Sequence, residues 1–155
     1  MDNKNHNQEQ KMQLIRLFPE RMRSALRDMD WHMEELEEIR IRSNQPIMFY
    51  YGDEQQYINI ARRKRTRERI QGEMISAQEV QSMLQIMCNY SMYAYAKDLN
   101  MGFLTLFGGC RVGVAREVIE ECGKVLLMEH ARFLNIRIAK ERKGCANNIM
   151  RHLFY

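Results

Sequence analysis

Two adjacent glycines, Gly108 and Gly109, are the first feature of the sequence that could do chemistry. Glycine-rich turns at the start of a helix can present backbone amides to a phosphate group. The surrounding residues do not fit that use, because the sequence contains no GxxxxGK[ST] and no GxGxxG that opens a helix, and a strand-like segment follows the pair. We therefore expect Gly108 and Gly109 to form a hairpin turn.

Other common catalytic and metal-binding patterns are also missing from the sequence. It has no GxSxG, no HExxH and no CxxC, and its histidines are scattered. The cysteines are expected to be reduced and mostly buried thiols: Cys88, Cys110, Cys122 and Cys145. We predict no free-standing catalytic site, no metal site and no cofactor bound by this chain alone.

A run of basic residues is the most charged part of the chain, whose net charge is only +4. Such a run can bind the phosphates of a nucleic acid or an anionic membrane surface. No aromatic residue lies within it to stack on a base, so a solvated surface loop is the favoured interpretation. A nucleic-acid-binding module that uses this run with Arg40 and Arg42 is the alternative. The basic patch consists of Arg62, Arg63, Lys64, Arg65, Arg67 and Arg69.

Length and composition indicate one domain with a real core, because 45% of the 155 residues are hydrophobic. The first eleven residues, MDNKNHNQEQK, are polar, and we predict a disordered tail over residues 1–11 and a domain over residues 12–155. This polar start does not resemble a secretory signal, and no apolar run is long enough to span a membrane. We therefore expect a cytoplasmic protein.

Hydrophobic periodicity predicts helices and strands in the first two thirds of the chain. A helix is expected to follow Pro19, and strands are expected over residues 37–42 and 47–51. Ser76 and Glu79 have the spacing of a capping box, so a helix should begin there and be followed by a second one near residues 92–99. The methionine-rich stripes of these helices could line a ligand groove, but core packing is the favoured interpretation.

A period of two residues predicts strands beyond Gly102, over residues 103–107, 111–116, 125–128 and 135–140, with a turn at residues 122–124. Together with the helices, these strands indicate an α+β fold. We expect the helices to pack on one face of a mainly antiparallel sheet.

Three segments of the sequence resemble the N-terminal half of the stage III sporulation protein AA family. They cover residues 18–47, 81–115 and 134–150, and their most specific blocks are GFLTLFGGCRVG and LNIRIAKERKGCA. Three positions depart from the family pattern. Cys110 stands where the family usually has histidine, residues 114–116 lack a glycine, and residues 131–133 replace a segment that commonly contains serine.

The resemblance implies a role in endospore formation. The family is understood as a peripheral cytoplasmic ATPase, related to the motor ATPases of type II and type IV secretion. It acts on the mother-cell side of the channel between mother cell and forespore, at the engulfing membrane. The implied partners are the other stage III sporulation A channel proteins, and self-association is also expected. ATP and Mg²⁺ are the cofactors of full-length members.

The family's phosphate-binding loop should follow the KGCA block, but only residues 147–155 remain here. Without the loop's lysine and its magnesium-binding Ser or Thr, phosphoryl transfer has no catalyst. We therefore expect a non-catalytic N-terminal assembly or regulatory domain that does not hydrolyse ATP alone.

The relatives also suggest a role for three arginines of this domain. In secretion ATPases, strand arginines reach the nucleotide held by the motor domain, where a guanidinium can neutralise phosphate charge. The corresponding candidates are Arg111, Arg116 and Arg137. A solvent-facing position on a strand explains them equally well. Asn135 and Lys140 to Lys143 could likewise form the junction with a motor domain.

Overall fold

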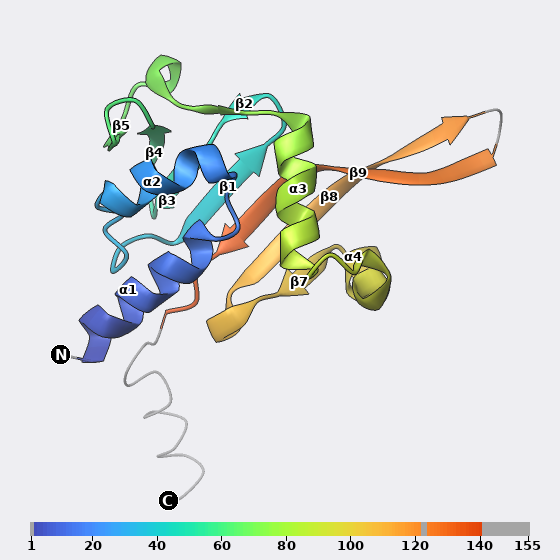
Figure 1. Ribbon diagram of the computed structural model, residues 1–155, viewed down its shortest axis with the longest axis horizontal. Coiled ribbons are helices and arrows are strands. Elements are labelled where there is room, and N and C mark those ends of the chain that lie inside the picture. Colours follow the sequence, from blue (N-terminus) through green and yellow to red (C-terminus); the bar gives the residue numbers. More distant parts are fainter. Residues whose placement is uncertain (1, 122–123, 141–155) are drawn as a thin grey trace, which may run out of the picture.

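Antiparallel strands build a seven-stranded sheet in the computed structural model, which describes residues 2–121 and 124–140 (Figure 1). The strand order is β5-β4-β3-β1-β9-β8-β7, and a separate short ladder pairs β2 with β6. The strands are β1 (Glu38–Arg42), β2 (Gln45–Pro46), β3 (Met48–Tyr51), β4 (Glu54–Asn59), β5 (Lys64–Thr66), β6 (Met74–Ile75), β7 (Phe103–Thr105), β8 (Arg111–Glu121) and β9 (Lys124–Arg137).

The helices cover one face of this sheet, which confirms the predicted α+β class. In Figure 1, α3 crosses in front of β8 and β9, and α1 and α2 lie in front of the strands of the first half. The helices are α1 (Asp2–Ile15), α2 (Glu20–Asp28), α3 (Ala77–Met87) and α4 (Ala96–Met101), with 3-10 turns at Arg69–Gln71, Met92–Tyr95 and Phe107–Gly109.

Several predicted elements are confirmed, but the strands differ in extent. The strand expected at residues 125–128 and most of the one expected at residues 135–140 belong to one continuous strand, β9, which also includes residues 129–134. β9 ends at Arg137, so residues 138–140 lie outside it. The prediction missed β4 and β5, and β5 lies inside the basic run that was expected to be a loop. Pairing with β4 explains β5, because backbone hydrogen bonds do not require apolar side chains. The turn predicted at residues 122–124 lies mostly outside the described residues.

The predicted start of α3 is confirmed in detail. The Ser76 side chain accepts a hydrogen bond from the Glu79 backbone amide, and Glu79 accepts one from the Ser76 amide. The Arg21 guanidinium of α2 also binds Glu79, at 2.8 Å. The apolar stripe of α3 is buried, as core packing predicts: Val80, Met83, Leu84 and Met87.

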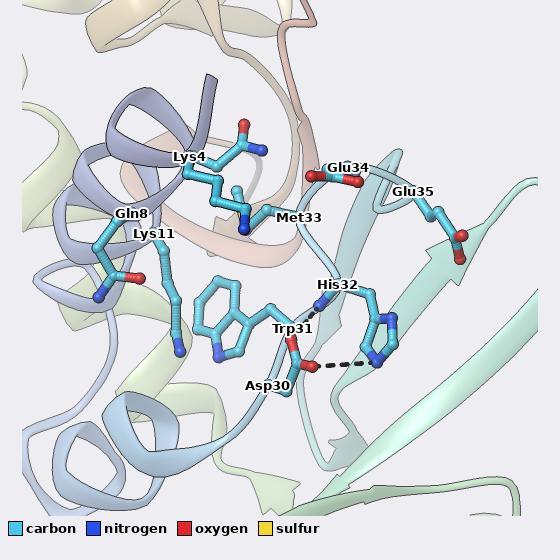
Figure 2. Close-up of a pocket in the computed structure, with 10 residues that line it drawn as sticks. Lys4, Gln8, Lys11, Asp30, Trp31, His32, Met33, Glu34 and Glu35 are labelled. Carbon is cyan, nitrogen blue, oxygen red and sulfur yellow. Dashed lines mark hydrogen bonds and ion pairs between the residues drawn. The ribbon is translucent and has the colours of Figure 1, made fainter. Parts of the chain in front are cut away.

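The N-terminal segment differs from the predicted disordered tail, because residues 2–15 form α1. Leu14 and Ile15 enter the core at its end, and Gln10 and Lys11 are buried as well. Figure 2 shows Lys11 beside Trp31, in a pocket of about 410 Å³ between α1 and residues 30–35. The segment is polar, and its buried residues are confined to its last six positions, where Gln10 and Lys11 form polar contacts.

Lys11 is the main polar contact of α1. Its Nζ donates hydrogen bonds to the carbonyls of Arg27, at 3.2 Å, and Met29, at 2.5 Å, where α2 ends. A cation at a helix C-terminus satisfies carbonyls that have no partner within the helix. Burial lowers the pKa of Lys11, and the nearby Asp30 and Asp28 oppose that shift. Gln10 adds a second contact, from its Nε2 to the Ala139 carbonyl at 3.1 Å.

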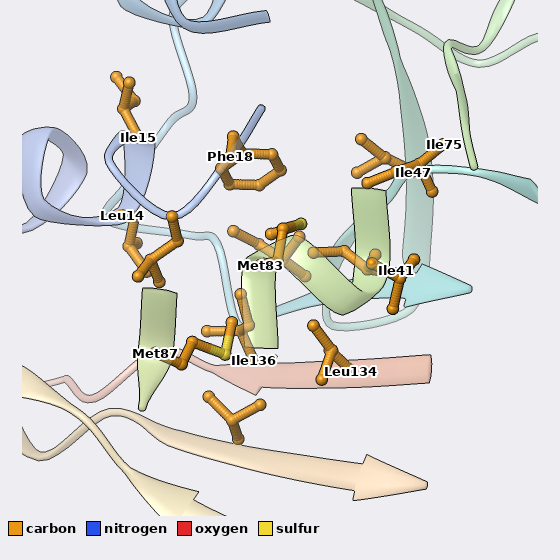
Figure 3. Close-up of a cluster of buried hydrophobic side chains, with 14 of the residues drawn as sticks. Leu14, Ile15, Phe18, Ile41, Ile47, Ile75, Met83, Met87, Leu134 and Ile136 are labelled. Carbon is orange, nitrogen blue, oxygen red and sulfur yellow. The ribbon is translucent and has the colours of Figure 1, made fainter. Parts of the chain in front are cut away.

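The core lies between the helices and the sheet, as Figure 3 shows for Met83 and Met87 of α3 beside Ile136 of β9. Trp31 is 1% exposed and packs edge to face against Phe49, with ring centroids 4.9 Å apart. No helix of the described residues is both long and apolar enough to cross a membrane.

The Lys11 contact predicts that Lys11→Met destabilises the fold. The variant leaves the Arg27 and Met29 carbonyls without their donor, so the free energy of unfolding should fall by about 1–3 kcal/mol. The free energy of unfolding can be measured by urea denaturation, monitored through the fluorescence of Trp31, the only tryptophan. Lys4→Met removes an exposed lysine from the same helix and should change little. Equal losses in both variants would contradict a specific role for Lys11.

The pair between Arg21 and Glu79 predicts a pH-dependent contribution to stability. The hydrogen bond from Arg21 lowers the pKa of Glu79, so the ionised carboxylate stabilises the folded state. This contribution is present above the unfolded-state pKa and is lost as pH falls through the folded-state pKa. Glu79→Gln should therefore lower the free energy of unfolding by about 0.5–1 kcal/mol at neutral pH, a modest loss because Arg21 is partly exposed. In acid, where Glu79 is protonated, the substitution should have no effect.

Urea unfolding across the acid range measures this difference. Glu9→Gln, which changes an exposed glutamate of α1, is the matched control and should follow the parent protein at every pH. A gap between Glu79→Gln and the parent that stays constant into acid would show that charge is not the cause.

Candidate functional site on the open face of the sheet

Side chains of three adjacent strands, β1, β9 and β8, alternate between the two faces of the sheet. Ile39, Val112 and Ile136 point to the helices and are fully buried. Their sequence neighbours point to the opposite face, which we call the open face because the helices do not cover it. Its central residues are Glu38, Arg40 and Arg42 of β1, Phe133, Asn135 and Arg137 of β9, and Arg111 and Gly113 of β8.

Two of the three candidate arginines meet on this face. Arg111 of β8 stands directly opposite Arg137 of β9 in the ladder, and both side chains are exposed. Directly opposed residues have Cβ atoms roughly 5 Å apart, so like charges in this arrangement repel each other. Two adjacent guanidiniums can bind one anion together, since each has a planar fork of donors.

Glu38 flanks the arginine pair on its other side. It stands opposite Arg137 in the pairing of β1 with β9 and forms an ion pair with Arg40 at 3.4 Å. A pocket of about 380 Å³ lies beside it, lined by Arg137 and Lys140 among others. Lys140 donates to the Glu34 carbonyl at 2.6 Å, which fixes the chain where it leaves β9. The arginine pair lies where β8 begins and β9 ends, within the interior of the sheet.

Arg116 does not join this pair. Its Nη2 donates to the Leu99 carbonyl at 2.6 Å and to Asn100 Oδ1 at 3.4 Å, near the end of α4. These contacts place the side chain on the helix side of β8, and they supply a cation to a helix C-terminus. The structure thus gives Arg116 a role in anchoring α4.

Arg40 and Asn135 lie one row further along the open face, directly opposite each other. The Arg40 guanidinium stacks over the Tyr50 ring at 4.3 Å. Arg40 Nε and Asn135 Oδ1 are nevertheless buried without a hydrogen-bond partner among the described residues. Buried polar atoms without partners are uncommon in proteins, so these two atoms can form hydrogen bonds with a water or a bound molecule. The alternation of β1 signalled a polar face, but it could not show which of its atoms lack partners.

The basic run is spread out and engaged by other residues. Arg63 pairs with Asp28, Arg67 with Glu54 at 2.6 Å, and Arg65 lies over the Tyr51 ring at 5.0 Å. Arg69 donates to Gln45 Oε1. Carboxylates therefore pair with Arg63 and Arg67, whereas Arg65 and Arg69 contact neutral groups.

Gly108 and Gly109 connect β7 to β8, which pair in antiparallel fashion. Their φ angles are +61° and +78°, values that favour glycine, and the connection forms a short 3-10 turn. Next to them, the buried Cys110 Sγ accepts a hydrogen bond from Gln10 Nε2 at 3.4 Å. The turn therefore contributes to the docking of α1.

Comparison with known proteins covers nearly the whole chain. The profile of the family described as "Sporulation stage III, protein AA" matches residues 8–155. Stage III sporulation protein AA of Bacillus subtilis (strain 168) is 31% identical over 143 residues. That match covers 92% of this chain and 42% of the relative, so the chain spans less than half of the relative's length. No solved structure matches the chain. The chain belongs to the stage III sporulation protein AA family.

Proposed function

We propose that this chain is an assembly and regulatory domain of a sporulation ATPase, and that nucleotide chemistry takes place on a separate P-loop motor domain. Membership of the stage III sporulation protein AA family supports the link to sporulation. The resemblance to secretion ATPases supports the division into two domains. In this proposal ATP and Mg²⁺ bind to the motor domain, because the 155 residues contain no GxxxxGK[ST].

The observation that carries this proposal is the opposition of Arg111 and Arg137. Arg111 and Arg137 repel each other directly across the ladder. Glu38, which stands on the other side of Arg137, is already paired with Arg40, so an additional anion would stabilise the arginine pair. The γ-phosphate of a nucleotide held by an adjacent domain would supply that anion. Arginines that approach a phosphoryl group during transfer stabilise the charge that develops on its oxygens.

The strands hold Arg111 and Arg137 in positions suited to contact a phosphoryl group. Both residues lie on long, paired strands, and their buried neighbours Val112 and Ile136 fix the directions of their side chains. A guanidinium held on a rigid element loses less entropy when it contacts its target. In the same proposal, the domain works in the cytoplasm at the mother-cell face of the channel and contacts other stage III sporulation A proteins.

The arginine pair predicts a loss of ATPase activity in a chimera. The chimera would carry this chain in place of the matching region of the B. subtilis relative. Mg²⁺-ATP hydrolysis should be absent from the 155-residue chain and present in the chimera. Arg111→Ala and Arg137→Ala should each lower the rate at least about tenfold, as expected when a donor to a charged transition state is lost.

Two controls separate a nucleotide contact from a general effect of charge or stability. Arg62→Ala removes an exposed arginine of the basic run and should leave the rate unchanged. Arg137→Lys keeps the charge but loses the planar fork, and should restore only part of the rate. Full activity of the Arg111→Ala and Arg137→Ala chimeras would exclude both arginines from the nucleotide site. Hydrolysis by the 155-residue chain itself would overturn the division into two domains.

A further inference from the structure

A second cationic site lies at the other end of the β1–β9 pair. It is a pocket of about 680 Å³, formed where β1 ends in the turn at residues 43–44 and where β9 bulges. Arg132 is the extra residue of this bulge, because Phe133 pairs with Ala115 while Ala131 pairs with Arg116. Bulges redirect side chains and are common beside functional sites. The volume is within the range of small-molecule sites, roughly 300–1,000 Å³.

The charge of this pocket has one sign. Arg42, Arg69 and Arg132 line it together with His130, and its described lining includes no aspartate or glutamate. Two of the guanidiniums are held by neutral groups. Arg42 lies over the Phe133 ring at 5.8 Å, and Arg69 donates to the Gln45 side chain. The contacts that orient Arg42 and Arg69 therefore leave their positive charge uncompensated, which favours an anionic ligand.

Ser43 gives the pocket a polar group without a partner. Its Oγ is buried and forms no hydrogen bond with the described residues. Its backbone amide donates to the Arg132 carbonyl at 2.9 Å, so the residue is fixed against the bulge. Ala77, the first residue of α3, also lines the pocket. An anion with several oxygens would satisfy the hydroxyl and the guanidiniums at once.

We propose that this pocket binds the phosphate group of an organic phosphate, either a lipid headgroup or a soluble phosphate ester. Phosphate fits better than a single carboxylate, because it carries more charge and offers oxygens to several arginines together. Phe133 and Met48 provide apolar walls for an organic group. Ile70 and Met74 are 93% and 51% exposed in an adjoining hollow that shares Arg69, which suits insertion into a lipid surface.

This pocket is separate from the Arg111–Arg137 pair. Phe133 lies four residues before Arg137 on β9, which corresponds to about 13 Å along a strand. The proposal therefore does not depend on the nucleotide contact described above, and its variants leave Arg111 and Arg137 in place.

Binding measurements on the full 155-residue chain test the proposal with two probes. Calorimetric titration with inorganic pyrophosphate reports a soluble phosphate site. Sedimentation with vesicles of phosphatidylcholine, with and without phosphatidylglycerol, reports a headgroup site. Arg42→Gln should weaken binding of whichever probe the parent protein binds about tenfold, since the substitution removes a charged hydrogen-bond donor. Ser43→Ala should weaken it several-fold without loss of stability, because the hydroxyl has no partner to lose.

Arg62→Gln is the matched control, because it removes the same charge from an exposed turn outside the pocket. Binding of pyrophosphate alone, sensitive to Arg42 and Ser43, supports a soluble ester as the ligand. Binding of the anionic vesicles alone, with the same sensitivity, supports a lipid headgroup. Failure to bind either probe overturns the proposal. Equal losses in Arg42→Gln and Arg62→Gln also overturn it, because the attraction would then be general.

Discussion

The central position of β9 is the constraint on which the rest of the structure depends. This strand is the last described one in the sequence, yet it lies between β1 and β8 and pairs with both. In the sheet, the strands of residues 38–66 meet those of residues 103–121 only through it. Its pairing with β1 closes a loop of roughly ninety residues, and closing this loop costs conformational entropy. Burial of the hydrophobic core offsets that cost. The two halves of the sheet therefore become one cooperative unit only when β9 is in place.

The alternation of β9 then produces two different surfaces. Leu134 and Ile136 turn toward α3 and join the core, whereas Asn135 and Arg137 turn toward the open face. Because the helices gather on one side, the open face keeps a row of charged and polar groups across three strands. Arg40 Nε and Asn135 Oδ1 sit in the middle of this row, buried but without partners in the described part of the chain. Such atoms suit a surface that another molecule covers.

Local sequence signals predicted the elements that local interactions form. The capping box at Ser76 and Glu79 marked the start of α3 because both of its hydrogen bonds lie within four residues. The spacing could not predict α1, because Lys11 and Gln10 are held by the distant carbonyls of Met29 and Ala139. Nor could it predict β5, which forms through its pairing with β4. Long-range contacts override local propensity in these elements.

In the candidate site too, local patterns predicted some features and long-range pairing determined the others. Period-two alternation correctly placed Arg111 and Arg137 on the polar side of their strands, but only the register shows that they oppose each other. Arg116 has the same parity on β8 as the buried Val112, so alternation turns it to the helix side, where it reaches the Leu99 carbonyl. Beside Arg116 the ladder bulges, and Arg132 is the extra residue on β9. That bulge brings Arg132 to the pocket beside Ser43. An irregularity in the ladder thus helps to form a second cationic site at the far end of β1.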